Sequence, residues 1–180
     1  FAFAINENNW LGTGVKLQTA LNLSTESISG NLQLNNPNYR YSKKSLKTGL
    51  DVSSTDRSSS SGFKSSRTGF NLGTGFEQYE DVWFTPEIII TLEDIEVEDS
   101  ASTSIKNMEG NFFNADFSYA LVLDKRDQAW KPTQGFRTSF VQTLPLILDS
   151  SAILNGLDVS VYHDFSEDLI GSFKFHTRAI

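Results

Sequence analysis

The chain has 180 residues and a net charge of −7, with 15 Lys and Arg residues against 22 Asp and Glu residues. This excess of acid argues against a nucleic-acid-binding protein, which would carry a basic stripe. The absence of cysteine excludes disulfide bonds, cysteine-ligated zinc and thiol nucleophiles. A mean hydropathy of −0.29 and the lack of a long apolar run exclude a transmembrane helix. They leave a transmembrane β-barrel open, because its strands alternate lipid-facing and lumen-facing residues.

The beginning of the sequence lacks two features of a complete precursor. It starts at Phe1 without an initiator methionine, and no basic region followed by an apolar run precedes the first strand pattern. We therefore expect the chain to be a section of a longer protein, cut within a structural element at each end.

Alternation of apolar and polar residues begins early in the chain. Within 13–24, Val15, Leu17 and Leu21 fall on one face of a strand, and Lys16 and Gln18 fall on the other. Such alternation is typical of a half-buried strand. The same pattern recurs in segments 44–55, 64–77, 111–124 and 168–180.

The whole pattern predicts an all-β protein of about ten antiparallel strands that follow one another as a meander. Many of these strands have about ten residues or more, whereas strands of soluble sandwiches usually have about five or six. A membrane-spanning strand needs about 9–11 residues, so strand length favours an up-and-down transmembrane β-barrel. The expected spans are 1–8, 13–24, 27–36, 44–55, 64–77, 81–97, 111–124, 134–146, 152–164 and 168–180.

The connections between these strands are predicted to alternate between compact turns and longer loops. The longer set includes the serine-rich segment 53–66 and the acidic segment 96–110. Outer-membrane barrels have short turns on the periplasmic side and longer loops outside. The three tryptophans, Trp10, Trp83 and Trp130, lie near the compact turns, which predicts an interfacial aromatic belt at that end. The compact turns are 8–12, 36–39, 78–80, 126–135 and 165–168.

A soluble β-sandwich with its apolar face inward gives the same alternation. Strand length, loop parity and tryptophan placement favour the barrel over this alternative. The polar faces then acquire a role, because residues such as Lys16, Gln18, Lys174 and His176 would line a wet interior.

Catalytic and metal-binding patterns are scarce. His163 and Asp164 are adjacent, so in a strand they point to opposite faces, and no G-x-S-x-G turn accompanies them. The acidic run 93–99 lacks the spacing of a calcium-binding loop. We expect no enzyme, no catalytic residue, no metal and no cofactor.

One turn, between the strands expected at 111–124 and 134–146, carries a more specific pattern, D-x-R-D-x4-P-x2-G-x-R. Arg126 can form a bidentate pair with a carboxylate, Asp124 or Asp127 can cap the turn, and Gly135 permits a positive φ. An ordinary well-capped hairpin would give the same pattern. Its residues are Asp124, Arg126, Asp127, Pro132, Gly135 and Arg137.

This turn resembles one in the barrel of the BamA family of outer-membrane-protein assembly factors. Two further turns resemble family turns in the expected order. One is N-x-L-G-x-G, formed here by Asn9, Leu11, Gly12 and Gly14, and the other is N-P-Y, formed by Asn36, Pro37 and Tyr39. Three such turns in order, at hairpin spacing, make the resemblance specific.

The resemblance implies that residues 1–180 form part of an outer-membrane barrel, running from about the second to the eleventh of the family's sixteen strands. It also implies a location in the outer membrane of a Gram-negative bacterium and a role in folding and inserting outer-membrane proteins. The implied partners are outer-membrane lipid, nascent β-barrel proteins and the accessory lipoproteins of an assembly (BAM) complex. The family's POTRA domains, first and last strands and V-R-G-[FY] loop motif do not occur in this sequence.

Three alternatives remain at this stage. A TamA-like or two-partner-secretion barrel would translocate its substrate, a passive porin would conduct ions, and a soluble adhesion or carbohydrate-binding sandwich would not enter a membrane.

Overall fold

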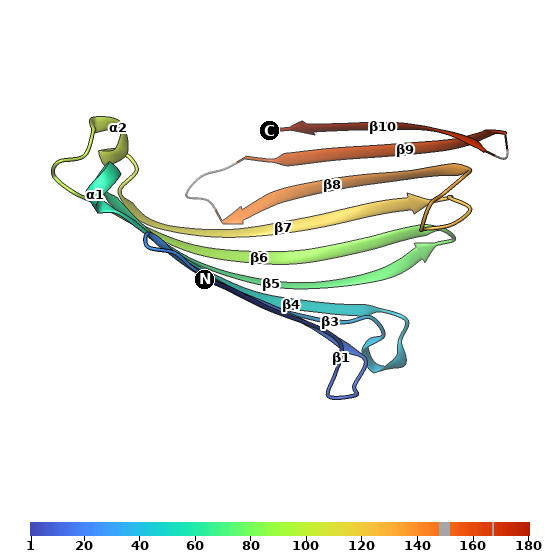
Figure 1. Cartoon of the computed structure of the whole chain (residues 1–180), viewed down its shortest axis with the longest axis horizontal. Coiled ribbons are helices and arrows are strands. Elements are labelled where there is room, and N and C mark those ends of the chain that lie inside the picture. Colours follow the sequence, from blue (N-terminus) through green and yellow to red (C-terminus); the bar gives the residue numbers. More distant parts are fainter. Residues whose placement is uncertain (148–151, 167) are drawn as a thin grey trace.

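A computed structural model describes residues 1–147, 152–166 and 168–180, and its strands form one sheet. The strands follow one another in chain order, and each pairs antiparallel with its neighbours. Figure 1 shows them as a continuous curved sheet with β1 and β10 at its edges. The predicted ten-strand meander is therefore confirmed, and the sheet is open. The strands are β1 (Ala2–Trp10), β2 (Val15–Leu23), β3 (Ser27–Asn36), β4 (Ser45–Arg57), β5 (Phe63–Tyr79), β6 (Val82–Val97), β7 (Gly110–Asp124), β8 (Gly135–Ile147), β9 (Leu154–Ser166) and β10 (Leu169–Ala179).

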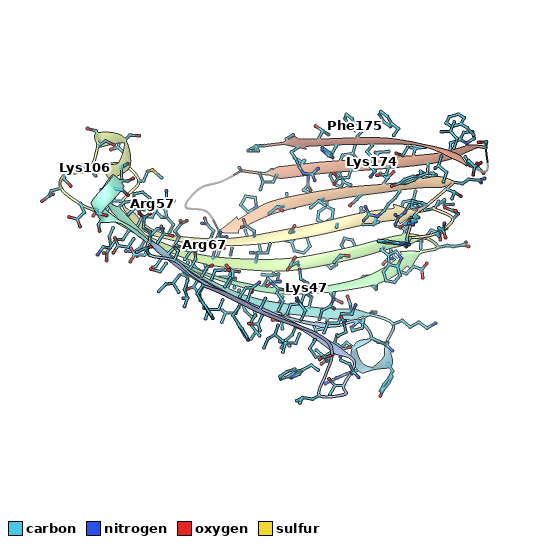
Figure 2. All side chains as sticks on the ribbon, viewed as in Figure 1. Lys47, Arg57, Arg67, Lys106, Lys174 and Phe175 are labelled. Carbon is cyan, nitrogen blue, oxygen red and sulfur yellow. The ribbon has the colours of Figure 1, made fainter. Side chains whose placement is uncertain are left out.

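The sheet has an apolar face and a polar face, because residues with period two keep their side wherever the pairing is regular, which is most of the length of each strand. On β5, Phe70 and Leu72 are 42% and 44% exposed, whereas Asn71 between them is buried. Phe70 pairs with Leu50 on β4 and with Ile90 on β6, which continues the apolar face across three strands. Figure 2 shows side chains projecting from both sides of the ribbon. A large exposed apolar surface of this kind matches the lipid-facing side of a barrel.

The polar face is the more crowded side of the sheet. A Cβ atom on Gly49 would overlap the side chains of Gln33 and Asn71, and one on Gly69 would overlap the Asp51 carboxylate. Glycine therefore makes room for long polar side chains to lie along the wall. This crowding is expected for the inner face of a curved sheet.

Along β6, the apolar stretch of this face has a defined length. Apolar residues occupy it from Phe84 to Leu92, and Asp94 and Glu96 follow on the same face. This apolar stretch is close to the ~9–11 residues that a tilted strand needs to cross a bilayer. Beyond Leu92, β6 continues as a charged extension.

The predicted loop at 53–66 is wrong. β4 extends to Arg57 and β5 begins at Phe63, with continuous pairing from Ser53–Arg67 to Arg57–Phe63. The connection is reduced to 58–62, which contains the one-turn helix α1 (Ser58–Ser61). Serine and threonine can extend a strand beyond the apolar band because backbone pairing holds it there without an apolar stripe.

The predicted alternation of loop length is also only partly correct. The connection 98–109, with helix α2 (Thr103–Lys106), is long as expected. The connection 125–134, however, lies at the end predicted to be compact and is longer than 24–26 or 58–62 at the other end. Its extra residues form the capped turn described below.

None of the helices in the described residues has the length and apolar character needed to cross a membrane.

Candidate functional site

The three turn motifs lie at the same end of the sheet, which we name the motif end. It comprises the connections 11–14, 37–44, 80–81 and 125–134, at the right of Figure 1. The connections 24–26, 58–62 and 98–109 lie at the other ends of the strands, which we name the serine end. In a meander, alternate connections lie at the same end of the sheet. The three motifs follow β1, β3 and β7, so they lie at one end.

Arg126 forms a bidentate pair with Asp124. Its Nε and Nη2 donate to the two carboxylate oxygens at 2.8 and 2.7 Å, and its backbone N–H donates to the same carboxylate at 3.3 Å. The pairing with Asp124 raises the pKa of Arg126 above its usual value. Arg137 Nε lies 3.8 Å from the same Asp124 side chain. The structure thus brings together Asp124, Arg126 and Arg137 from β7, the turn and β8.

Asp127 caps the turn separately. Its carboxylate accepts hydrogen bonds from Thr133 Oγ1 at 2.8 Å and from the backbone N–H groups of Thr133 and Gln134 at 3.0 and 3.2 Å. The hydrogen bond from the Thr133 side chain, helped by the backbone donors, lowers the pKa of the Asp127 carboxyl. Arg126 therefore pairs with Asp124, and Asp127 orders the far half of the turn.

Gly135 closes the turn in a conformation that favours glycine. Its φ is +93°, and a Cβ atom there would overlap the Lys125 carbonyl oxygen. Lys125 N–H donates to Phe136 O at 2.8 Å, so the two strands are already joined at this level. Pro132 lies in the loop before it, where no ladder hydrogen bond is required.

In the turn after β1, an asparagine side chain accepts a backbone hydrogen bond, as Asp127 does in the turn after β7. The Asn9 side chain accepts a hydrogen bond from Gly14 N–H at 2.6 Å, and Asn9 O accepts one from Gly12 N–H at 3.0 Å. Leu11, Gly12 and Gly14 all have positive φ. This conformation explains why glycine occupies positions 12 and 14.

The turn after β3 is held by two asparagines. Asn36 Oδ1 accepts from Asn38 N–H at 3.1 Å, and Asn38 Oδ1 accepts from Lys43 N–H at 2.9 Å. Pro37 lies between these asparagines, and Tyr39 begins the 3₁₀ turn η1 (Tyr39–Tyr41). Asn38 was not among the predicted residues, although asparagine side chains commonly bond to nearby backbone in turns.

The three tryptophans all lie at the motif end, but Trp83 lies on the polar face of the sheet. Trp10 and Trp130 are 41% and 80% exposed. Trp83 pairs with Glu77 and with Val122, which places it on the polar face. Trp83 therefore lies on the side opposite the apolar surface.

An aromatic row on the apolar face crosses four strands near the motif end. Phe76 and Phe84 meet edge to face with ring centroids 5.8 Å apart. Tyr119 continues the row 5.9 Å from Phe84, and Phe140 follows 6.2 Å from Tyr119. Aromatic residues gathered at one level of an apolar sheet are typical of the interfacial girdle of a membrane barrel.

The polar face carries a connected network across β3 to β6. Gln33 Nε2 donates to Asn71 Oδ1 at 3.4 Å, and Asn71 Nδ2 donates to Glu87. Lys47 Nζ lies 3.5 Å from the same Glu87 carboxylate. Glu87 is thus paired with Lys47 and Asn71 within the polar face.

His163 and Asp164 do not form a catalytic pair. The His163 ring packs edge to face on Phe165, whereas Asp164 accepts a hydrogen bond from Gln134. Among the described residues, no group of three or more His, Cys, Asp or Glu residues could hold a metal ion.

A meander with one apolar face, one polar face and an aromatic row defines a section of the wall of an up-and-down β-barrel of the outer-membrane type. A family model, the Omp85 superfamily domain, matches residues 9–179. The chain belongs to the Omp85 superfamily.

A solved structure supports the fold. The crystal structure of BamA from Haemophilus ducreyi lacking POTRA domains 1–3 is similar, with a TM-score of 0.63 and 18% sequence identity. The match covers 97% of this chain and 38% of that chain, so this chain spans well under half of its solved relative. No curated protein matches the sequence. The predicted resemblance is confirmed for the superfamily and for the fold.

Proposed function

We propose that the chain forms part of the barrel wall of a BamA-like factor that folds and inserts β-barrel proteins in the outer membrane of a Gram-negative bacterium. The observation that carries this proposal is the Omp85 match over residues 9–179. The apolar face, with residues such as Phe70 and Leu72, would contact lipid, and the polar network around Glu87 would line the interior.

The mechanism we propose is non-covalent and requires no catalytic group or cofactor. A sheet edge presents backbone N–H and C=O groups that can pair with an incoming strand. The residues described here would provide the rigid wall that holds such a seam, and the capped turns at the motif end would fix the strand order. Nascent outer-membrane proteins and accessory lipoproteins are the proposed partners.

The test uses the full-length protein reconstituted in phospholipid vesicles. Urea-unfolded outer-membrane β-barrel protein is added, and its folding is followed by the heat-modifiable shift in gel mobility. We expect faster folding than in vesicles that contain an unrelated barrel of similar size. Unchanged folding together with simple ion conductance would overturn the proposal in favour of a passive porin. Passage of a substrate across the vesicle membrane, without its insertion, would favour a translocation barrel.

A further inference from the structure

The hairpin connection 37–44 is cationic although the chain as a whole is acidic. It contains Arg40, Lys43 and Lys44, and no Asp or Glu occurs between Glu26 and Asp51. With a net charge of −7 for the whole chain, this is a local reversal of sign. Local clusters of cations beside a membrane surface favour anionic lipids.

Two of these cations lie against aromatic rings. The Arg40 guanidinium is 5.3 Å from the centroid of the Tyr39 ring, and Lys44 Nζ is 5.2 Å from the centroid of the Phe76 ring. Phe76 is the first member of the aromatic row on the apolar face. Lys44 therefore lies at the level where the apolar surface meets the motif end.

The hairpin is also ordered by its own hydrogen bonds. Tyr39 N–H donates to Lys44 O at 2.8 Å, and the Asn38 side chain holds Lys43 N–H at 2.9 Å. Tyr41, between them in the chain, is 93% exposed. A ring with an apolar body and a polar hydroxyl suits the boundary between hydrocarbon and headgroups.

The hairpin cations differ from Lys125 and Arg126 in how their charges are compensated. At the same end, Arg126 is paired with Asp124 at 2.7 Å, and Lys125 Nζ lies 4.0 Å from Asp81. In the described part of the chain, no carboxylate lies within 4 Å of the charged nitrogens of Arg40, Lys43 or Lys44. Their charges remain available to an anion from outside the chain.

We propose that the hairpin 37–44 binds the phosphate headgroup of anionic phospholipid in the membrane leaflet at the motif end. The proposal rests on the membrane placement given under the proposed function. Phosphate is the shared chemistry of a lipid headgroup and of free phosphate. The contact between Lys44 and the aromatic row favours the lipid, because it joins the cations to the apolar surface.

The test compares binding of two lipids to the full-length protein in detergent, after its own lipid has been removed. Phosphatidylglycerol or phosphatidylcholine is titrated in, and bound lipid is counted by native mass spectrometry. We expect the wild-type protein to prefer phosphatidylglycerol, and R40Q/K43Q/K44Q to lose that preference by about tenfold or more. The matched control R57Q/K64Q/K106Q removes the same charge at the serine end, where Figure 2 labels Arg57 and Lys106, and should keep the preference.

Each other result has a defined meaning. Equal preference for phosphatidylglycerol in R40Q/K43Q/K44Q and wild type would overturn the proposal. An excess of inorganic phosphate that displaces phosphatidylglycerol completely would show a phosphate site and overturn the lipid assignment. Heat-modifiable mobility verifies that each variant is folded. The readout is lipid binding and not substrate folding, so failure here leaves the assembly role standing, and failure of the assembly test leaves lipid binding measurable.

Discussion

The two ends of the sheet are held in different ways. At the motif end, side chains bond to backbone several residues along the chain, as from Asp127 to Gln134 and from Asn9 to Gly14. At the serine end, the bonds between side chains and backbone span only two or three residues, as where Ser58 N–H donates to Asp56, and the strand pairing itself continues to the connection. Specific residues therefore determine the turns at the motif end, whereas extended pairing determines the serine end.

Backbone conformation shows the same contrast. In the described residues, every non-glycine residue with positive φ lies at the motif end. Such conformations are unfavourable for most residues, by about 1–2 kcal/mol each, so the caps at this end offset local strain. They are Leu11, Arg40, Tyr41, Lys43, Asp81 and Lys131.

The strongest test of this contrast is Gly135→Val. The substitution combines an unfavourable φ with overlap at the Lys125 carbonyl, so we expect the full-length protein to lose about 3 kcal/mol of stability. The measurement is the urea midpoint in detergent, with heat-modifiable mobility as a check on folding. Gly12→Ala is the control, because its φ is +72° but no heavy atom lies within 4 Å of the added Cβ. Equal, small losses in both variants would contradict the crowding argument.

Arg126→Ala should have the second-largest effect. It removes the bidentate pair and leaves Asp124 with only Arg137, at 3.8 Å. We expect a loss of about 1–2 kcal/mol, since the pair is only partly exposed, and reduced assembly of the protein into the membrane. Arg126→Lys keeps the charge but lacks the planar guanidinium, so its stability should lie between that of wild type and that of Arg126→Ala. Unchanged heat-modifiable migration of Arg126→Ala would count against the role of Arg126.

Acid should weaken the motif end through Asp127. Its pKa is lowered in the folded protein, so its contribution to stability is present above the unfolded value of about 3.9 and disappears as pH falls through the lower folded value. We expect the difference in urea midpoint between wild type and Asp127→Asn to shrink across that acid range. A difference that stays constant with pH would refute the assignment. Asp127→Asn also leaves the Arg126–Asp124 pair intact.

The smallest effect is expected at the serine end. Ser58→Ala removes one exposed hydrogen bond, from Ser58 Oγ to Asp56 at 2.6 Å. We expect a change within about 0.5 kcal/mol, because pairing of β4 with β5 holds the connection. A loss as large as that of Arg126→Ala would erase the distinction between the two ends.

The sequence predicted the strands well where alternation was strong. The span expected at 111–124 is observed as Gly110–Asp124, and 27–36 as Ser27–Asn36. Alternation failed at 53–66, because polar residues on both faces conceal a strand that pairing with its neighbours maintains. The position of these strands within a sixteen-strand barrel remains a prediction.

The turn chemistry was only partly accessible from the sequence. The pattern around Arg126 left two carboxylates as partners, and only the fold places Asp124 against the guanidinium and Asp127 against Thr133. The orientation of Trp83 was likewise hidden, because it depends on the register of β6 with β5. Local spacing indicates where a turn lies, whereas its side-chain pairs depend on geometry across strands.

The strand order also has a consequence for how the sheet is made. Every strand pairs with its predecessor in the chain, so each new pairing closes only a short connection. The entropic cost of closing a connection grows slowly with its length, and even the longest among the described connections, 98–109, joins adjacent strands. The sheet can therefore grow by zippering, hairpin by hairpin, from either edge of a paired nucleus. The order of growth would be set by which turns form first. The turns at the motif end are stabilised by hydrogen bonds within the turn itself, so we expect them to form before the others.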